Sequence, residues 1–456
     1  MSQHDLYLLA VAVLVILAAV FAIARLRMHP FPALVIAALA LGLLAGAPVD
    51  QVLKSFRTGF GDTLANVGVL LALGAMFGEL LASSGGAERV SSALLKIGGT
   101  TAIPWTMCAV SMILGLPLFF EAGVVLMMPI ILNVGARIAS DPAGLKGNPY
   151  LLAGLPVFAG LSVLHALVPP HPGPMIAIDA MKADLGTTLI LGILLSIPIA
   201  VVAGPIYTFW IAPRATAAPP VDLVGRLTQQ DTKHRSPGLA ATIFTILFPI
   251  LLMLGKAGAD LALPAGHPVH GLFTFFGNPI VALLLAVLLS MFTFGFFLGK
   301  DTRAVGKLLG DALPPISAIM LIIGAGGALK QTLIDVGLGA VIAEASQQVH
   351  LSPLLLGWFT AVILRLATGS ATVAIVTASG LMAATVTVNP NLNPSLMALS
   401  IGAGSLFFSH INDAGFWLVK EYMGMNLPNM FKTWSVLETI IAVMGLFLCL
   451  GLQLVM

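Results

Sequence analysis

Charged residues are scarce in this 456-residue sequence, where only 9% of positions are Asp, Glu, Lys or Arg. A soluble domain has roughly a quarter of its residues charged. The hydrophobic fraction is 58%. The sequence therefore predicts an all-α polytopic protein that spans the lipid bilayer several times. A formal net charge of +2 is too small to indicate a nucleic-acid partner.

Cysteine is almost absent as well. Cys108 and Cys449 both lie in apolar runs, and their spacing fits neither a disulfide framework nor a metal site. We interpret them as small buried apolar residues. The N-terminus lacks a basic segment and a small-residue cleavage site, so residues 6–24 are interpreted as a first transmembrane helix rather than a removed signal peptide. No cofactor is expected.

Long apolar runs, in contrast, follow one another closely, and the pattern predicts about twelve hydrophobic segments. They cover residues 6–24, 31–45, 64–82, 105–136, 151–168, 185–211, 240–254, 279–298, 313–329, 354–386, 396–408 and 434–455. A polar loop is expected around Lys54, Arg57 and Asp62, and a basic loop around Lys300 and Arg303. Residues 85–96 predict a short amphipathic helix at the surface.

The longest polar segment, residues 213–237, is basic, and we expect it in the cytoplasm as a linker. It separates residues 1–212 from residues 238–456. Apolar runs and their interruptions follow one another in a similar order in these two parts. The sequence GDTL at residues 61–64 matches GDAL at residues 310–313, and the interruptions of the apolar runs recur in the same order. This predicts an internal duplication, and paired interruptions are typical of a transporter's site. The basic loops favour inverted topology of the halves, against which Lys54 and Arg57 argue.

Residues 162–174, SVLHALVPPHPGP, combine two histidines with four prolines in apolar surroundings. Proline removes a backbone donor and restricts the preceding residue, so no continuous helix can pass through this stretch. Broken backbone at membrane depth is tolerated only beside protein or a water-filled cavity. We therefore expect the stretch to line a site, with His171, Pro172 and Gly173 facing a ligand.

Three ionisable residues of the first half are candidates for carrying a proton or cation. Glu121 lies between two apolar half-runs, and intramembrane carboxylates are usually functional, although a carboxylate reaching the interface is the alternative. His165 and His171 titrate near neutral pH, which suits proton coupling. Each can equally be a structural histidine bonded to a carbonyl that a proline leaves free. No metal site is predicted, because no further ligand lies nearby in sequence.

The second half supplies a matching break at Gly369, Ser370 and Thr372. Small hydroxyl-bearing residues at a helix break can bind a carboxylate or a polyol, and small-residue helix packing is the alternative. Arg365 lies four residues earlier. Its guanidinium can clamp a substrate carboxylate, or pair with Glu121 or an acidic residue near position 413.

A second polar cluster contains His410, Asn412 and Asp413. Asn412 is expected to bind substrate, whereas His410 and Asp413 are candidates for proton or cation coupling. Lys330 closes an apolar run, and we interpret it as a helix end whose amine reaches the interface.

Four segments resemble the gluconate permease family of bacterial inner-membrane symporters. They are FFEAGVVLMMPI (119–130), HALVPPHPGP (165–174), LRLATGSATVA (364–374) and FSHINDAGFWLVKEY (408–422). The resemblance runs through essentially the whole chain in order. It implies an ion-transporter-type fold, with inverted repeats, broken helices and re-entrant hairpins. It also implies a multi-pass protein of the bacterial inner membrane.

Members of that family take up gluconate or related hydroxy acids with protons, so the resemblance implies a proton symporter with such a substrate. A carrier of the same fold for another small organic acid or D-serine, and sodium coupling, are alternatives. A channel is a further alternative. An intramembrane enzyme would need a nucleophile, and Ser162 near His165 is the only candidate, with nothing to orient it. A homodimer is left open.

Overall fold

The computed structural model describes residues 2–94, 100–140, 145–220, 236–264, 267–337, 341, 352–389, 392–411 and 413–456. All regular secondary structure in these ranges is helical. Nine of the described helices are long and apolar enough to cross a membrane, and five shorter apolar helices accompany them. The prediction of an all-α polytopic membrane protein is confirmed. Residues 221–235 of the expected linker lie outside the described ranges.

The helices before the linker begin with α1 and α2, which pack on each other, and end with α11. They are α1 (Gln3–Ala24), α2 (Pro30–Leu44), α3 (Val49–Thr63), α4 (Val69–Ala82), α5 (Gly86–Leu94), α6 (Ile103–Gly115), α7 (Phe120–Ser140), α8 (Pro149–Leu167), α9 (Pro172–Met181), α10 (Leu185–Val201) and α11 (Tyr207–Ile211). The apolar helices were placed to within a few residues by sequence.

The helices after the linker follow a similar order. They are α13 (Leu239–Ala262), α14 (Pro268–Phe276), α15 (Pro279–Ser290), α16 (Thr302–Asp311), α17 (Pro314–Asp335), α19 (Pro353–Thr368), α20 (Ala371–Val388), α21 (Pro394–Gly404), α22 (Ala414–Met423), α23 (Leu427–Met430) and α24 (Val436–Gln453). Breaks between α8 and α9 and between α21 and α22 occupy equivalent places in this order. The duplication and its inversion stay predictions.

The prediction of a polar loop around Lys54 and Asp62 is wrong, because this segment is helix α3. α3 continues through a π-helical turn, Leu64–Gly68, into α4. The segment Val49–Ala82 therefore forms one continuous helical rod. The buried positions of α3 are Val52, Ser55, Gly59 and Thr63. Their spacing of three and four residues marks one helix face, which the charged residues on the other faces had masked. The basic loop after residue 300 is likewise helix α16.

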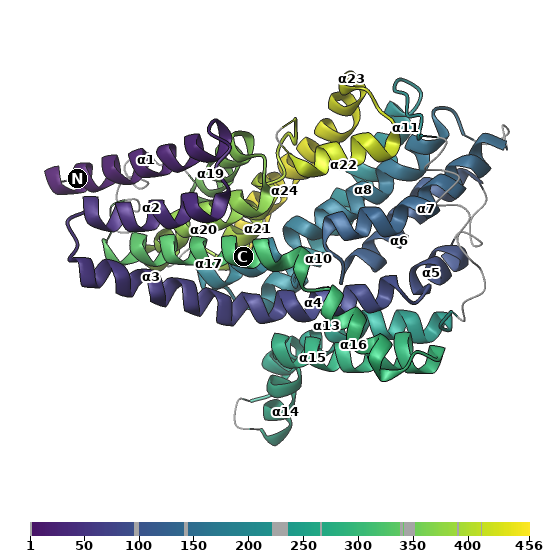
Figure 1. Cartoon of the computed structure of the whole chain (residues 1–456), viewed down its shortest axis with the longest axis horizontal. Coiled ribbons are helices and arrows are strands. Elements are labelled where there is room, and N and C mark those ends of the chain that lie inside the picture. The colour runs from purple at the N-terminus through teal and green to yellow at the C-terminus, as the bar shows by residue number, and fades with distance from the viewer. Residues whose placement is uncertain are drawn as a thin grey trace.

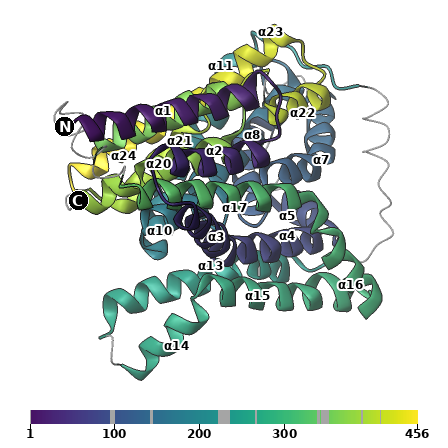
Figure 2. The same cartoon turned by 60° about the vertical axis from the view of Figure 1, so that its left-hand side comes forward.

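In Figure 1 the rod of α3 and α4 runs across the molecule from left to right, and α13–α16 lie below its α4 part. α17 packs on α3, whereas α15 and α16 pack on α4. Figure 2 shows α14 projecting away from the rest of the bundle. Through α17 the rod reaches α20, and α20 in turn packs against α9 and α19. Through α17 and α20 the rod therefore supports the broken helix α8–α9.

The break between α8 and α9 is short. It spans four residues, because α8 ends at Leu167 and α9 starts at Pro172. Pro172 and Pro174 lie in the first turn of α9, where a helix N–H has no partner and proline costs little. The prolines thus stop one helix and start the next, as the sequence indicated.

A second reversal lies between α19 and α20. Gly369 caps α19 with φ of 72°, a left-handed conformation that glycine adopts without steric cost. Ser370 then caps α20, and its side chain accepts a hydrogen bond from the N–H of Val373 at 3.3 Å. The two helices pack against each other, so the chain turns back at Gly369.

Candidate functional site

A cavity of about 220 Å³ lies among the helix breaks. Pockets for drug-sized ligands occupy roughly 300–1,000 Å³, so this cavity suits a smaller molecule. Its walls combine aromatic, hydroxyl and ionisable side chains with backbone at the breaks. The lining residues that the argument uses are Glu121, Ser162, His165, Arg365, Thr368, Gly369, Ser370, Thr372, Asp413, Trp434 and Glu438.

Three helix N-termini meet at this cavity. Its wall includes Phe120 and Glu121 at the start of α7, Ala371 at the start of α20, and Ala414 at the start of α22. The first N–H groups of a helix have no intrahelical partner and carry a partial positive charge. Helix N-termini are therefore ready-made binding sites for anions. The convergence of these helix starts gives the cavity a positive electrostatic potential that comes from the backbone.

Arg365 provides a full positive charge in the same place. Its side chain is 4% exposed. Nη1 donates a hydrogen bond of 2.7 Å to the carbonyl of Gly369, and Nη2 forms an ion pair with Asp413. The Nε–H group is buried without a hydrogen-bond partner. The guanidinium thus ties α19 to the start of α22 while it keeps one donor free, and an unmade buried donor is costly.

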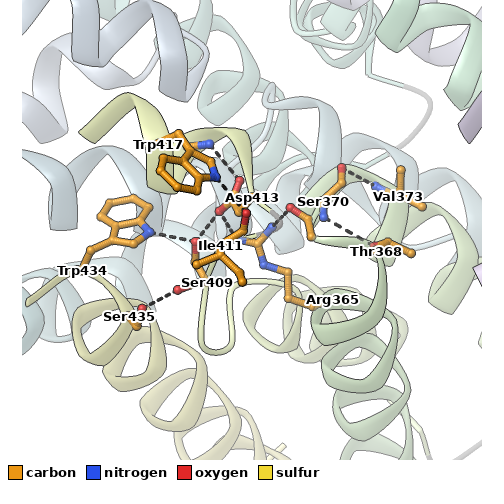
Figure 3. Close-up of polar contacts among 12 residues, drawn as sticks. Arg365, Thr368, Ser370, Val373, Ser409, Ile411, Asp413, Trp417, Trp434 and Ser435 are labelled. Atoms are coloured by element: carbon orange, nitrogen blue, oxygen red, sulfur yellow. Dashed lines mark hydrogen bonds and ion pairs between the residues drawn. The ribbon is translucent and has the colours of Figure 1, made fainter. Parts of the chain in front are cut away.

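Asp413 is held by donors on several sides, as Figure 3 shows. One carboxylate oxygen accepts hydrogen bonds from Arg365 and from the Ser409 hydroxyl. The other accepts a bond of 2.8 Å from the N–H of Gly415, which caps α22. Trp434 in turn donates to the Ser409 oxygen at 2.7 Å. A chain of hydrogen bonds and one ion pair therefore connects α19 to the helical turn that precedes α24.

Glu438 is a carboxyl in the cavity wall that the sequence analysis missed. It lies in the first turn of α24, and its side chain is 1% exposed. The Ser162 hydroxyl of α8 hydrogen-bonds to it, while Oε1 has no partner. A single acidic residue inside the apolar run of residues 434–455 was the available signal, because intramembrane carboxylates are rarely incidental.

Most of the predicted site residues come together at this cavity. Arg365, Gly369, Ser370 and Thr372 line it from the second half, with Asp413. Glu121 and His165 line it from the first half, Glu121 with an exposed side chain and His165 half-buried with an unpaired Nδ1. The interpretation of Arg365 as a structural partner of Asp413 describes the observed pairing, and its free Nε–H keeps the clamp interpretation open.

Other predicted residues lie away from the cavity lining. His171 is buried behind it, with its ring 6.0 Å from that of His165 and hydrogen-bonded to the backbone of Gly115. A Cβ atom on Gly173 would stand 2.4 Å from Cδ1 of Ile375, so this glycine allows α9 to pack on α20. Pro172 starts α9 and is buried.

The remaining two predicted site residues, His410 and Asn412, precede α22 in the sequence. His410 is half-buried and hydrogen-bonds the backbone of Leu366 at the end of α19. It therefore holds the turn beside the cavity rather than contributing to the cavity wall. Asn412 lies outside the described residues.

Another group of polar residues, apart from the cavity, lies near the C-terminal end of α9. Lys330 of α17 forms an ion pair of 2.8 Å with Asp179 of α9, and each side chain is 12% exposed. Asn66 in the π-helical turn donates to the same carboxylate at 3.1 Å. The interpretation of Lys330 as an interfacial helix end is wrong, because its amine pairs within the bundle. The ion pair connects α9 to α17, and the hydrogen bond from Asn66 connects α9 to the α3–α4 rod.

An apolar helical bundle whose broken helices enclose a polar cavity is the architecture of secondary transporters, and this chain is a transporter rather than an enzyme. The family model of the GntP family permeases matches residues 6–455, and the chain belongs to this family. The resemblance stated from the four motifs is confirmed.

Relatives share this assignment over their whole length. A gluconate permease of Pseudomonas aeruginosa is 42% identical over 454 residues, which cover 100% of this chain and 99% of the relative. The Gnt-II system L-idonate transporter of Escherichia coli is 37% identical over 430 residues, covering 94% of this chain and 95% of the relative. The crystal structure of the Alcanivorax borkumensis YdaH transporter superposes with a TM-score of 0.66 at 13% identity, covering 93% of this chain and 99% of that one. This last likeness concerns the fold alone.

Proposed function

We propose that this protein carries gluconate or a closely related sugar acid across the bacterial inner membrane together with a proton. Both relatives described above are named for sugar acids. The observation that carries the proposal is the unpaired Nε–H of Arg365 in a cavity where three helices begin. A carboxylate bound there would satisfy the buried donor and meet the positive ends of the helices.

The hydroxyl groups of a sugar acid would find partners on the same walls. Ser370 and Thr372 present hydroxyls at the start of α20, and Thr368 presents one at the end of α19. These groups both donate and accept hydrogen bonds, which suits a polyol. A substrate without hydroxyls would leave them unpaired and bind more weakly.

Transport would follow the alternating-access scheme of broken-helix carriers, in which one half moves against the other around a fixed site. The ionisable groups proposed for coupling in the sequence analysis were Glu121, His165, His410 and Asp413. Three of them line the cavity, so a proton bound there would travel with the substrate.

Uptake into proteoliposomes tests this function. Radiolabelled gluconate should accumulate when the lumen is alkaline relative to the medium, and collapsing the gradient with a protonophore should release it. Protein-free liposomes are the control. Absence of uptake with every sugar acid tried would refute the proposed substrate class, and uptake indifferent to the gradient would refute symport.

The choice among acids needs a comparison of ligands. A bound ligand at 100 times its Kd stabilises a protein by about 2.7 kcal/mol. We expect gluconate and L-idonate to raise the melting temperature of the purified protein more than D-serine or short hydroxy acids. Replacing sodium by choline in the uptake buffer should leave transport unchanged. A larger shift with D-serine, or loss of uptake in choline, would favour the alternative substrate or the alternative ion.

A further inference from the structure

Glu438 combines deep burial with incomplete hydrogen bonding. Its side chain is 1% exposed, and it borders the cavity directly. Ser162 is its hydrogen-bond partner, and Oε1 has none. A carboxylate taken out of water without donors is costly, whereas the protonated acid needs far less compensation. The geometry therefore fits a carboxyl that changes its protonation state.

The helices packed on α24 supply no cation to neutralise Glu438. α10 and α21 contain no ionisable side chain, and the ionisable side chains of α8 are Tyr150 and His165, of which Tyr150 is never a cation. The π-helical turn before α24 contains Lys432, which is exposed. α19 contributes Arg365, which already bonds Gly369 and Asp413. Among the described residues no basic side chain forms an ion pair with Glu438.

The other carboxyls at the cavity are less suited to carry a proton. Asp413 accepts from Arg365, Ser409 and Gly415, and such donors stabilise the ionised form. Glu121 has an exposed side chain, so water compensates its charge in either state. Glu438 is nearly fully buried, and among the described residues it has no ion-pair partner.

The charges in the cavity explain why a proton would be needed. Asp413 and Arg365 neutralise each other as a pair. A substrate carboxylate brings one negative charge, and an ionised Glu438 would add a second in a space of about 220 Å³. Like charges at this separation in a poorly solvated site repel each other strongly. Protonation of Glu438 removes the conflict, so an anion and a proton enter together.

We propose that Glu438 is the proton-carrying group of this transporter. The proposal rests on the function proposed above. The carboxylate takes a proton from water on the outer side, which forms an O–H bond and permits the anionic substrate to bind. After the cavity opens inward the substrate leaves, and the carboxylate returns the proton to water. Ser162 positions the carboxyl between the two states.

The test compares Glu438→Gln with Glu421→Gln, an exposed glutamate on α22 that is 72% accessible. In the wild type, linkage of one proton to binding makes the Kd for gluconate rise about tenfold per pH unit once the group ionises. Glutamine imitates the protonated acid, so Glu438→Gln should bind gluconate with a Kd independent of pH. Its gradient-driven accumulation should fall to the level without a gradient. Glu421→Gln should keep the wild-type slope and accumulation.

The outcomes separate this inference from the proposed function. A wild type that accumulates gluconate, alongside a Glu438→Gln variant that keeps the wild-type accumulation and pH slope, would overturn the role of Glu438 alone. A wild type that binds no sugar acid would overturn both. Ser162→Ala, which removes the hydroxyl partner, should move the pH midpoint of binding while the slope stays. An unmoved midpoint would contradict the positioning role of Ser162.

A measurement on the wild-type protein covers the case in which Glu438→Gln does not fold. Dicyclohexylcarbodiimide reacts with protonated carboxyls in apolar surroundings, and peptide mapping locates the adduct. We expect labelling at Glu438 that falls as pH rises and falls again when gluconate is present. No label at Glu438 at low pH, with label at Glu121 or Asp413 instead, would overturn the proposal.

Discussion

Arg365 combines three tasks in one side chain. It caps the end of α19 through Gly369, pairs with Asp413, and keeps a buried Nε–H group without a hydrogen-bond partner. The planar guanidinium allows this because its five N–H groups point in fixed directions. A compact ammonium cannot reach all three places at once.

We predict that Arg365→Lys weakens gluconate binding by about 2–3 kcal/mol, roughly 30- to 150-fold in Kd, because a hydrogen bond to a charged group is lost. Isothermal titration of purified protein measures the change. Arg214→Lys is the matched control, since Arg214 is exposed and is not part of the cavity lining. A Kd within threefold of the wild type would show that Arg365 serves only the structure.

Individual residues also show how far sequence reasoning reached. The breaks at Ser370 and Asp413 were predicted because glycine and polar residues interrupt apolar runs there. Glu438 was missed because a lone acidic residue does not interrupt the apolar pattern of its helix. Gly173 was predicted to face a ligand, but it does not line the cavity. A glycine is required there because a larger residue would clash with Ile375. Which polar residue faces the cavity depends on packing between helices, and sequence spacing does not specify this.

At the scale of helices, the contact between α3 and α17 is unusually close. A Cβ atom on Gly59 would stand 2.3 Å from the carbonyl oxygen of Gly327. Small residues allow helix backbones to approach in this way, and such contacts drive association where no hydrophobic effect acts. Close packing explains why a helix with this many charges is still part of the bundle.

We predict that Gly59→Ala lowers the unfolding free energy by about 1–3 kcal/mol, because the added methyl group overpacks the contact. Differential scanning fluorimetry in detergent would report the loss as a lower melting temperature. Gly61→Ala is the control on the same helix, because nothing lies within 4 Å of its Cβ position. Equal melting temperatures for the two variants would contradict the packing interpretation.

The ion pair between Lys330 and Asp179 connects α17 to α9. Lys330→Met should destabilise the protein by about 3 kcal/mol, because it leaves a largely buried carboxylate without its cation. The double variant Lys330→Met with Asp179→Asn should recover part of the loss. Lys182→Met is the control, since this lysine contacts the same carboxylate at 3.4 Å but is 75% exposed; its effect should stay under about 0.5 kcal/mol. Matching losses from both lysines would rule out a special role for the pair.

Helix extents show the limit of the hydropathy pattern. The apolar helices α1, α2 and α10 were recognised directly. α3 and α16 were interpreted as loops, because an amphipathic helix buried on one narrow face carries nearly the composition of a loop. Val305 is the buried residue of α16, so little apolar signal was present to find.

At the scale of the whole molecule, the sequence predicts two related halves of inverted topology, and their relative orientation is open to direct measurement. We predict that cysteines introduced at Arg27, Ser236 and Thr302 react with a membrane-impermeant maleimide from the cytoplasmic side only. Background labelling should be low, because Cys108 and Cys449 are buried. Right-side-out and inverted vesicles provide the comparison. Reaction of the Thr302 site from the opposite side to the Arg27 site would contradict inverted halves.

The meeting of three helix starts has a consequence for pharmacology. Much of the attraction for an anion comes from main-chain amides, and these persist whatever side chains surround them. The cavity should therefore discriminate poorly between a carboxylate and a sulfonate of similar size, while a neutral lactone of the same sugar would gain nothing from it. A non-metabolised sulfonate analogue of a sugar acid becomes a rational starting point for a competitive inhibitor.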